Sequence, residues 1–590
     1  MEAPAFSDRF ADTWLRATPS YVTDLSRCMP QSALGDRAAA GRWRMLPYET
    51  DTLTGVMLRA DPETAAPAVT CPLGVSGWHA VSVGLYAVHA GEQVIVLVRL
   101  SGEETFTKLA LFEARREEQG HIKELFWRIA DLTGHDLVLA QLHRRTAPGD
   151  AAGAMSCPRA RVAYVKLVPL GADEVRIVQR ERAERGTRRL YAVNDAHGLH
   201  ANFRATTPEA IRRELEPFRD TDFGRIYWEC GMGDLLYYPG NAGRIPTFDG
   251  LSDFHSTNAR YHCECWRIFR EQGLDPFRIA RDYAREIGME FHAGYRVAGF
   301  KFPSDHDHFD HGDSFYDRHP ELRGTARSGE ATPRLSHAYA ETRRFAVDLL
   351  REVASTYDVD GVSLAYNRRP PLVEYEPPVV AGFKAELGLD PFDLDPADRR
   401  WLAYRAGVLT GFMQEVRAAM DSLAHEQGRR RISVSAIVMA SEEENLQMGM
   451  DLPAWIEQGL VDTIIPYTSV PALDSTQDSW VDPRDGAWFL SITKGTPCEV
   501  AFNLMPRHMS AETYRRRAAG LYGIGAERFA FWDCTPEQRA DGTSAWSALR
   551  RLGHRDEVLA GAQAGEPGLG ATLVPVRKLA GWDRSYATPG

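Results

Sequence analysis

Eight short apolar runs recur between residues 190 and 534, and each of them ends in polar or aromatic residues. Helical patterns fill most of the intervals between them. A strand–helix unit repeated eight times, over about 250 residues or more, is typical of an α/β protein with a (β/α)8, or TIM, barrel. We therefore predict such a barrel over residues 190–560. Its strands are Leu190–Asp195, Arg225–Cys230, Glu290–Arg296, Gly361–Asn367, Ile432–Met439, Thr463–Thr468, Glu499–Asn503 and Phe529–Cys534.

The intervals between the runs carry signals of helices. Thr207 and Pro208 place a capping hydroxyl before a proline at the first helical position. Residues 335–356 and 401–425 are long amphipathic stretches that lead into the fourth and fifth strands. Between the sixth and seventh runs, residues 474–485 lack a strong helical pattern. We expect that connection to be the least regular part of the barrel.

Residues 20–172 predict a separate antiparallel β-sandwich of the jelly-roll type. Short strands with alternating or wholly apolar patterns are separated there by Pro, Gly, Asp and Thr. A charged connector follows at residues 173–189. The tail, residues 561–590, becomes apolar again at 572–579, and we expect it to add a strand to the sandwich. The predicted sandwich strands are residues 77–88, 93–100, 124–130, 136–140 and 161–170.

Composition narrows the range of partners. The 590 residues carry a net charge of −12 that is spread along the chain, which argues against a nucleic-acid or anionic-membrane partner. No run approaches the ~18 apolar residues of a membrane span. The first residues have neither a basic start nor an apolar stretch, so we expect a cytoplasmic protein; a signal peptide already removed would leave secretion open. The eight scattered cysteines favour free thiols in a reducing compartment.

Polar and aromatic residues cluster where the predicted strands end. A TIM barrel carries its active site at this end of the strands. Aromatic, amide and carboxylate side chains around one mouth suit a sugar better than a phosphate or a nucleotide, so we predict a carbohydrate substrate. The predicted substrate-binding residues are Asp195, Trp228, His292, Tyr295, Arg296, Asn367, Arg368, Tyr375, Tyr467, Asn503, Trp532 and Asp533.

Glycoside hydrolysis normally needs two carboxyl groups across the scissile bond. Glu229 follows two aromatic residues at the end of the second strand, where partial burial would suit an acid catalyst. The alternative is that Glu229 pairs with a neighbouring barrel arginine. Glu374 and Glu376 lie on a proline-stiffened loop after the fourth strand and are the predicted partners of Glu229. Solvated loop charges are the alternative for both of them.

Two other acidic segments have competing interpretations. Glu442–Glu444 is more simply a solvated run than a catalytic one. Residues 305–313 alternate His and Asp and could supply metal ligands, but a polar lid explains them with fewer assumptions. We therefore predict no resident metal and no cofactor.

Three segments resemble the glycosyl hydrolase-like family 10 barrels. The first contains Phe315–Glu321 and Leu335–Tyr339, the second Tyr357–Leu364, and the third Gly449–Ile456. The resemblance implies a barrel assigned to carbohydrate hydrolysis. Family members often carry an aspartate in the fourth strand, whereas this chain reads Ser363-Leu364-Ala365-Tyr366-Asn367 there, so no catalytic aspartate is carried over.

The end of the N-terminal region, residues 131–141 and 161–170, resembles galactose-binding-like jelly rolls. Such a domain either packs on the barrel as a structural unit or binds sugar as a carbohydrate-binding module. For the whole chain we predict a glycoside hydrolase. The alternatives are a non-hydrolytic carbohydrate-binding barrel protein and a metal-dependent barrel hydrolase. The sequence leaves the sugar, the linkage, the stereochemical outcome and the oligomeric state open.

Overall fold

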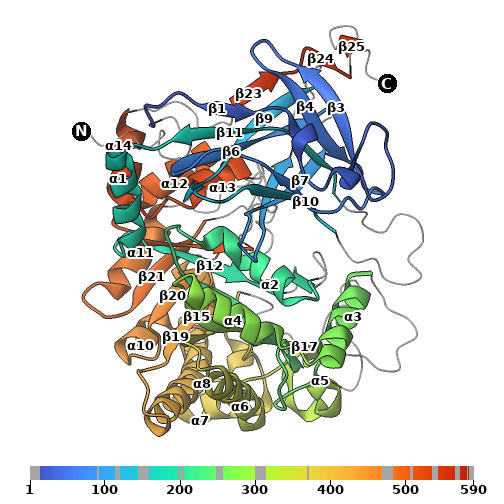
Figure 1. The fold of residues 1–590 in the computed structure, drawn as a ribbon. Coiled ribbons are helices and arrows are strands. Elements are labelled where there is room, and N and C mark those ends of the chain that lie inside the picture. Colours follow the sequence, from blue (N-terminus) through green and yellow to red (C-terminus); the bar gives the residue numbers. More distant parts are fainter. Residues whose placement is uncertain are drawn as a thin grey trace.

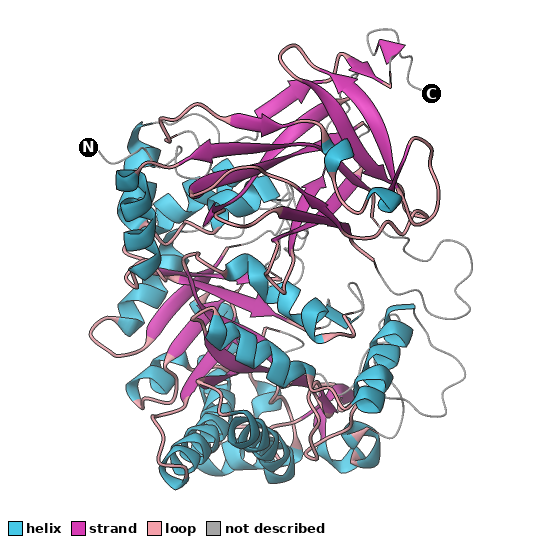
Figure 2. Cartoon of the chain, in the orientation of Figure 1, coloured by secondary structure: helices cyan, strands magenta, loops and turns pink. Residues whose placement is uncertain are grey.

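A computed structural model describes residues 14–583 apart from thirteen gaps, which are residues 89–91, 113–119, 144–157, 197–198, 201–204, 247–256, 299–313, 368–370, 468–482, 505–508, 534–542, 565–571 and 581. A strand-rich N-terminal part lies at the top of the view and a barrel ringed by helices lies below it (Figures 1 and 2). The predicted fold class, an antiparallel N-terminal domain followed by a TIM barrel, is confirmed.

The N-terminal part consists of two antiparallel sheets. The larger one is built around β9 (His121–Asp131), β6 (Trp78–Ala87), β11 (Ala160–Pro169), β4 (Thr54–Ala60) and β3 (Trp43–Glu49), in that order. The smaller one has the order β5 (Val69–Cys71), β10 (Leu137–Gln141), β7 (Gln93–Leu100) and β8 (Thr107–Phe112). Apolar side chains of both sheets, such as Val83 of β6 and Val96 of β7, form one core between them.

Three short segments complete the N-terminal part. β1 (Ser20–Val22) pairs with β11. From the tail, β23 (Thr572–Pro575) pairs with β9 and β24 (Lys578–Leu579) pairs with β3, both antiparallel. The charged connector is helical over most of its length, as α1 (Ala172–Ala183).

Eight parallel strands close into a barrel. Each of the eight strands is hydrogen-bonded to the next one along the chain, and β12 pairs with both β13 and β22, which closes the ring. The boundaries match the apolar runs of the sequence to within a few residues. The strands are β12 (Leu190–Asn194), β13 (Phe223–Met232), β15 (Glu290–Arg296), β18 (Gly361–Ala365), β19 (Ser433–Val438), β20 (Thr463–Pro466), β21 (Glu499–Asn503) and β22 (Arg528–Trp532).

Helices ring the barrel and begin where caps predict them. The Thr207 hydroxyl accepts the backbone N–H of Ala210, and Pro208 follows it. Between β20 and β21 the structure has a helix, α11, that residues 474–485 did not suggest, since it begins at Pro483 and extends to Thr493. The other principal helices are α2 (Pro208–Leu215), α3 (Thr257–Gln272), α4 (Pro276–Glu286), α6 (Ala340–Tyr357), α7 (Pro377–Leu387), α8 (Arg399–Glu426), α9 (Glu442–Gln447), α10 (Leu452–Glu457), α12 (Ala511–Gly523), α13 (Thr543–Leu549) and α14 (Arg555–Ala564).

Alternate residues of each barrel strand face the lumen, as the two-residue period of a strand requires. The lumen core contains Tyr191 and Val193 of β12, Tyr227 of β13 and Ala365 of β18. Their neighbours in sequence, such as Ala192 and Leu364, belong to the core between the strands and the helices. This alternation decides which residues at the strand ends can reach the mouth.

The N-terminal part packs on the barrel through α2 and α13. The Lys108 ammonium of β8 lies 2.5 Å from the Glu214 carboxylate of α2, and both side chains are buried. The backbone N–H of Ala110 donates to the Thr543 hydroxyl at the start of α13. None of the described helices is both long and apolar enough to cross a lipid bilayer.

Candidate active site

Polar side chains in the lumen-facing phase meet at the C-terminal ends of the barrel strands. Asp195 lies two residues after Val193, Glu229 two after Tyr227, Asn367 two after Ala365 and Asn503 two after Ala501, so each continues the inward face of its strand. Tyr467 and Trp532 are themselves members of the lumen core. The described part of the barrel thus gathers acids, amides and aromatic rings on one inner surface.

Arg296 joins the two acids of this surface. Its Nε lies 2.7 Å from a Glu229 carboxylate oxygen, and its Nη2 donates to Asp195 at 3.1 Å. Its guanidinium carbon lies 5.7 Å from the Trp532 ring centroid. Burial disfavours the charged guanidinium, but the carboxylates of Glu229 and Asp195 outweigh burial, and the pKa of Arg296 is raised. A permanent cation therefore holds two carboxylates close together in a largely buried site.

These groups border a small cavity at the mouth. Its volume is about 20 Å³, room for roughly one water molecule. Glu229, Arg296 and Trp532 line it together with Ser363, whose position in the lumen-facing phase of β18 was readable from Ala365 but was missed in the sequence. A carboxylate, a guanidinium and an aromatic face therefore line the same small space at the mouth.

Glu229 is ion-paired with a barrel arginine, which was the alternative to its role as an acid catalyst. A nearby guanidinium favours a charged carboxylate. Glu229 is therefore suited to act as a nucleophile, a base or a stabiliser of positive charge rather than as a proton donor. Asp195 contacts another nitrogen of the same guanidinium, so it is the candidate partner of Glu229 in catalysis. Asp533 acts on Arg296 electrostatically from the same end of the barrel.

Several predicted binding residues lie elsewhere. The Trp228 ring stacks on Phe291, in the core between strands and helices, because it has the outward phase of β13. The Tyr295 hydroxyl donates to the Gly233 carbonyl, although the residue still borders the cavity. His292 lies deeper in the lumen, with its ring 5.1 Å from that of Tyr227. Arg368 lies outside the described residues, as do residues 305–313.

The structure does not bring Glu374 or Glu376 to the cavity that Glu229 lines. Glu376 is buried and accepts the backbone N–H groups of Glu374, at 2.8 Å, and Thr325, at 3.4 Å. Glu374 pairs with Arg334 at 2.9 Å. Tyr375, between them, packs against Trp401 in a separate apolar cluster. The proline-rich loop folds back on its own surroundings, so its acids have structural partners instead of a place in the lumen.

Two buried polar side chains, one in β18 and one just after it, have no hydrogen-bond partner among the described residues. Neither amide atom of Asn367 makes a hydrogen bond there, and neither does the Ser363 hydroxyl. Both side chains are almost fully buried. Leaving a buried polar group unpaired costs about 1–3 kcal/mol. A ligand hydroxyl at the mouth would satisfy such groups.

His337, in the segment Leu335–Tyr339 that carried the family resemblance, is a buried neutral side chain. Its ring packs edge-on against Phe412 with centroids 4.7 Å apart, and neither ring nitrogen has a hydrogen-bond partner among the described residues. Burial, aided by Arg343, lowers the pKa of His337 to about 3 from its usual 6.5. The residue is therefore part of the packing and takes no part in acid–base chemistry near neutral pH.

We expect His337 to make the protein sensitive to acid. Its folded-state pKa is below its unfolded-state value, so its stabilising contribution is complete above pH 6.5 and is lost as the pH falls from 6.5 toward 3. The free energy of unfolding should fall by up to about 1.4 kcal/mol per pH unit there, and His337→Phe should remove this part of the slope. Urea titrations of both proteins at several pH values measure it. Equal slopes would contradict the assignment.

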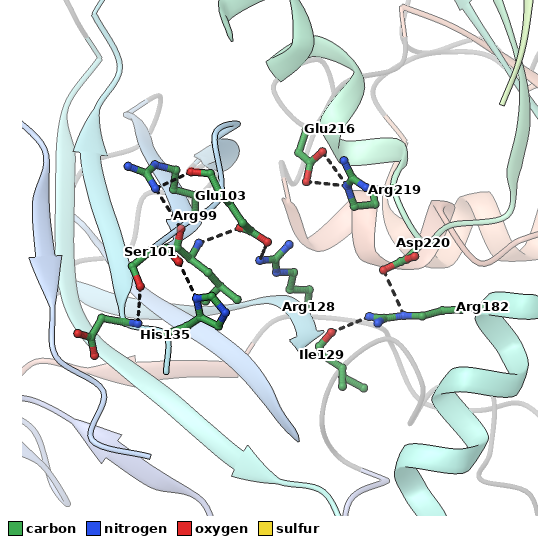
Figure 3. A network of polar contacts seen from close by, with 12 residues as sticks. Arg99, Ser101, Glu103, Arg128, Ile129, His135, Arg182, Glu216, Arg219 and Asp220 are labelled. Carbon is green, nitrogen blue, oxygen red and sulfur yellow. Dashed lines mark hydrogen bonds and ion pairs between the residues drawn. The ribbon is translucent and has the colours of Figure 1, made fainter. Parts of the chain in front are cut away.

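A larger hollow, of about 130 Å³, lies between the N-terminal part and the barrel. Several of its charges are paired with one another. Arg182 contacts Asp220 at 3.2 Å and Arg219 contacts Glu216 at 3.0 Å (Figure 3). Near it, the described residues include a group with metal-ligand spacing, Glu181, His554 and Glu557, but Arg551 already pairs with both of those acids. This network holds the domains together, so we assign the site to the barrel mouth.

Comparison with known proteins supports a carbohydrate-related barrel. Residues 255–479 match the model of the family "Glycosyl hydrolase-like 10". An S-layer-related protein of Niallia circulans is 26% identical over 185 residues, which are 26% of this chain and only 11% of that protein.

Two solved structures share a similar arrangement of the chain. The PgaB (BpsB) glycoside hydrolase domain from Bordetella bronchiseptica has a TM-score of 0.40 at 14% identity, over 62% of this chain and 98% of that one. Alpha-L-fucosidase isoenzyme 2 from Paenibacillus thiaminolyticus has a TM-score of 0.40 at 12% identity, over 64% of this chain and 50% of that one. Similarity this low adds nothing to the choice of site or substrate. The galactose-binding-like kinship of the N-terminal part stays a prediction, whereas the resemblance of the barrel to glycosyl hydrolase-like family 10 is confirmed over residues 255–479.

Proposed function

We propose that the barrel mouth hydrolyses a glycoside, with Glu229 and Asp195 as its working carboxylates. The observation that carries this proposal is the pair of acids held on two nitrogens of the Arg296 guanidinium, beside the Trp532 ring. Oxygens that contact one planar guanidinium lie only a few ångströms apart, as the two acids of a retaining glycosidase do. An aromatic face beside them offers a surface for a sugar ring.

The chemistry follows from the charges. The Glu229 carboxylate, kept ionised by Arg296, either attacks the anomeric carbon or stabilises the positive charge that develops there. Asp195 has 16% of its side-chain surface exposed against 6% for Glu229, so solvent reaches it more readily. One guanidinium cannot neutralise two carboxylates, and its contact with Asp195, at 3.1 Å, is longer than its contact with Glu229, at 2.7 Å, so Asp195 is the acid that more readily takes up a proton. We assign the proton transfer to the leaving oxygen and the later activation of water to Asp195. Arg296 orients both groups.

A second candidate function is sugar binding without hydrolysis. It is favoured by the absence of a carboxylate in β18 and by the pairing of both acids with one arginine. In that case the same side chains recognise sugar hydroxyl groups, and the acids serve as hydrogen-bond acceptors.

A panel of soluble polysaccharides and nitrophenyl glycosides separates the two candidates. Release of reducing ends or nitrophenol, absent from the Glu229→Gln/Asp195→Asn double variant, supports hydrolysis. Calorimetric binding of a panel member without release by the unaltered protein favours the binder. Release that persists in the double variant would refute the assignment of these acids.

Replacing Asn367 should raise the stability of the protein and lower its affinity for the ligand. Asn367→Leu removes a buried amide without a described partner, so we expect the free energy of unfolding to rise by about 1 kcal/mol. The affinity for the carbohydrate should fall about tenfold, because a hydrogen bond to the ligand is lost. Urea unfolding and calorimetry measure the two effects. A variant that loses stability and keeps its affinity would show that Asn367 is bonded within the protein.

A further inference from the structure

Two cysteines of the N-terminal part face each other across neighbouring backbone segments. Met29 and Thr70 form an antiparallel bridge and exchange both of their backbone hydrogen bonds, at 2.9 and 2.8 Å. In an antiparallel register the next pair outward is Cys28 with Cys71. This pair is of the non-hydrogen-bonded kind, in which Cα atoms lie about 4.5 Å apart and the side chains are closest.

That spacing is within the range of a disulfide. Cα atoms of bonded cysteines lie about 4.4–6.8 Å apart. The two thiols lie close enough that Cys28 raises the pKa of the Cys71 thiol. Both are buried in the core that the two sheets share. The neighbouring Cys28, and then burial, favours the protonated Cys71 thiol, so Cys71 is not poised for reaction while the fold is closed.

The segment that carries Cys28 crosses the sandwich. It begins with β1, which pairs with β11 in the larger sheet, and reaches Met29, which pairs with the β5 edge of the smaller sheet. Leu25, between these two points, is fully buried in the shared core. A covalent bond at Cys28 would therefore fasten the crossing segment, residues 20–29, to the smaller sheet.

We propose that Cys28 and Cys71 form a structural disulfide when the chain folds or opens in the presence of a small disulfide oxidant such as oxidised glutathione. A thiolate of the pair attacks the glutathione disulfide and releases one reduced glutathione. The second cysteine attacks the resulting mixed disulfide, closes the protein disulfide and releases another. Two protons and two electrons leave the protein for the two glutathione thiols.

Peptide mapping of the unaltered full-length protein tests the proposal. The protein is incubated with either reduced or oxidised glutathione in urea below the unfolding transition, all remaining thiols are blocked with iodoacetamide, and the digest is analysed by mass spectrometry. After oxidation we expect one peptide that joins Cys28 to Cys71, two hydrogens lighter than the sum of its parts. Cys498, which is also buried, should remain alkylated and serves as the internal control.

Thermal unfolding gives a second readout. The oxidised protein should melt about 5 °C or more above the reduced one, because the cross-link restricts the unfolded chain. Cys71→Ala should abolish this difference between the redox states, while Cys498→Ala should keep it. Alkylation of Cys28 and Cys71 to the same extent as Cys498 after oxidation would overturn the proposal. A linked peptide that joins either of them to another cysteine would overturn it as well.

Discussion

Arg296→Met should lower turnover strongly and destabilise the barrel. The substitution keeps much of the side-chain volume but leaves the Glu229 and Asp195 carboxylates buried against each other without their cation. Removing one partner of a buried ion pair costs about 3–5 kcal/mol. We expect the free energy of unfolding to fall by that amount and the hydrolysis of a cleaved glycoside to fall by about 10² or more. Urea unfolding and initial rates measure the two losses.

Arg296→Lys is the matched comparison, because it keeps the charge but cannot reach both acids with a planar fork. Its stability should lie between those of the unaltered protein and Arg296→Met, whereas its activity should remain low. An Arg296→Met variant with unchanged stability would mean that the two carboxylates are not held as a charged group in the folded protein.

Glu229→Gln should lower turnover by about 10² or more while sugar affinity changes less than threefold. The amide keeps the shape of the side chain and its neighbours but cannot carry the charge that the reaction needs. Asp195→Asn should show a loss of the same order, together with a flattened dependence of the rate on pH. Initial rates across pH, combined with calorimetric titration of the same sugar, separate catalysis from binding.

Glu376→Gln is the control, since Glu376 is as buried as Glu229 and accepts backbone hydrogen bonds instead of lining the cavity. Burial raises the pKa of Glu376, but its role is to hold Glu374 and Thr325 in place. Turnover of this variant should stay within a few-fold of the unaltered protein. Loss of turnover in Glu376→Gln with retention in Glu229→Gln would return the chemistry to the proline-rich loop.

The barrel was predictable because its strands are buried on both faces. Such strands appear as continuous apolar runs, and the fully buried β18 and β20 lie within the runs Gly361–Asn367 and Thr463–Thr468. The helix α11 was missed because Pro483 and Gly486 in its first turn interrupt the helical pattern of the sequence. Residues before it, from 468 to 482, lie outside the described part of the chain.

The site was only partly predictable, because a strand end alone does not say which side chains face inward. Asp195, Glu229, Arg296 and Trp532 meet as expected, since they share the inward phase of their strands. Trp228 points the other way, and the phase of Tyr227 could have shown this. The partners of Glu374 and Glu376 could not be foreseen, because Arg334 and Thr325 approach through tertiary folding from residues some 40–50 positions earlier.

The pairing of the tail with the larger sheet has a consequence for how the protein is made. β23 pairs with β9 at one edge of the larger sheet and β24 pairs with β3 at the other. Residues 572–579 therefore cover both edges of that sheet. During synthesis the ribosome completes these residues only after the whole barrel. Until then both edges expose unpaired N–H and C=O groups, which are templates for pairing with another chain. A chain that ends before Thr572 should therefore keep its barrel and yet aggregate through its N-terminal sheet.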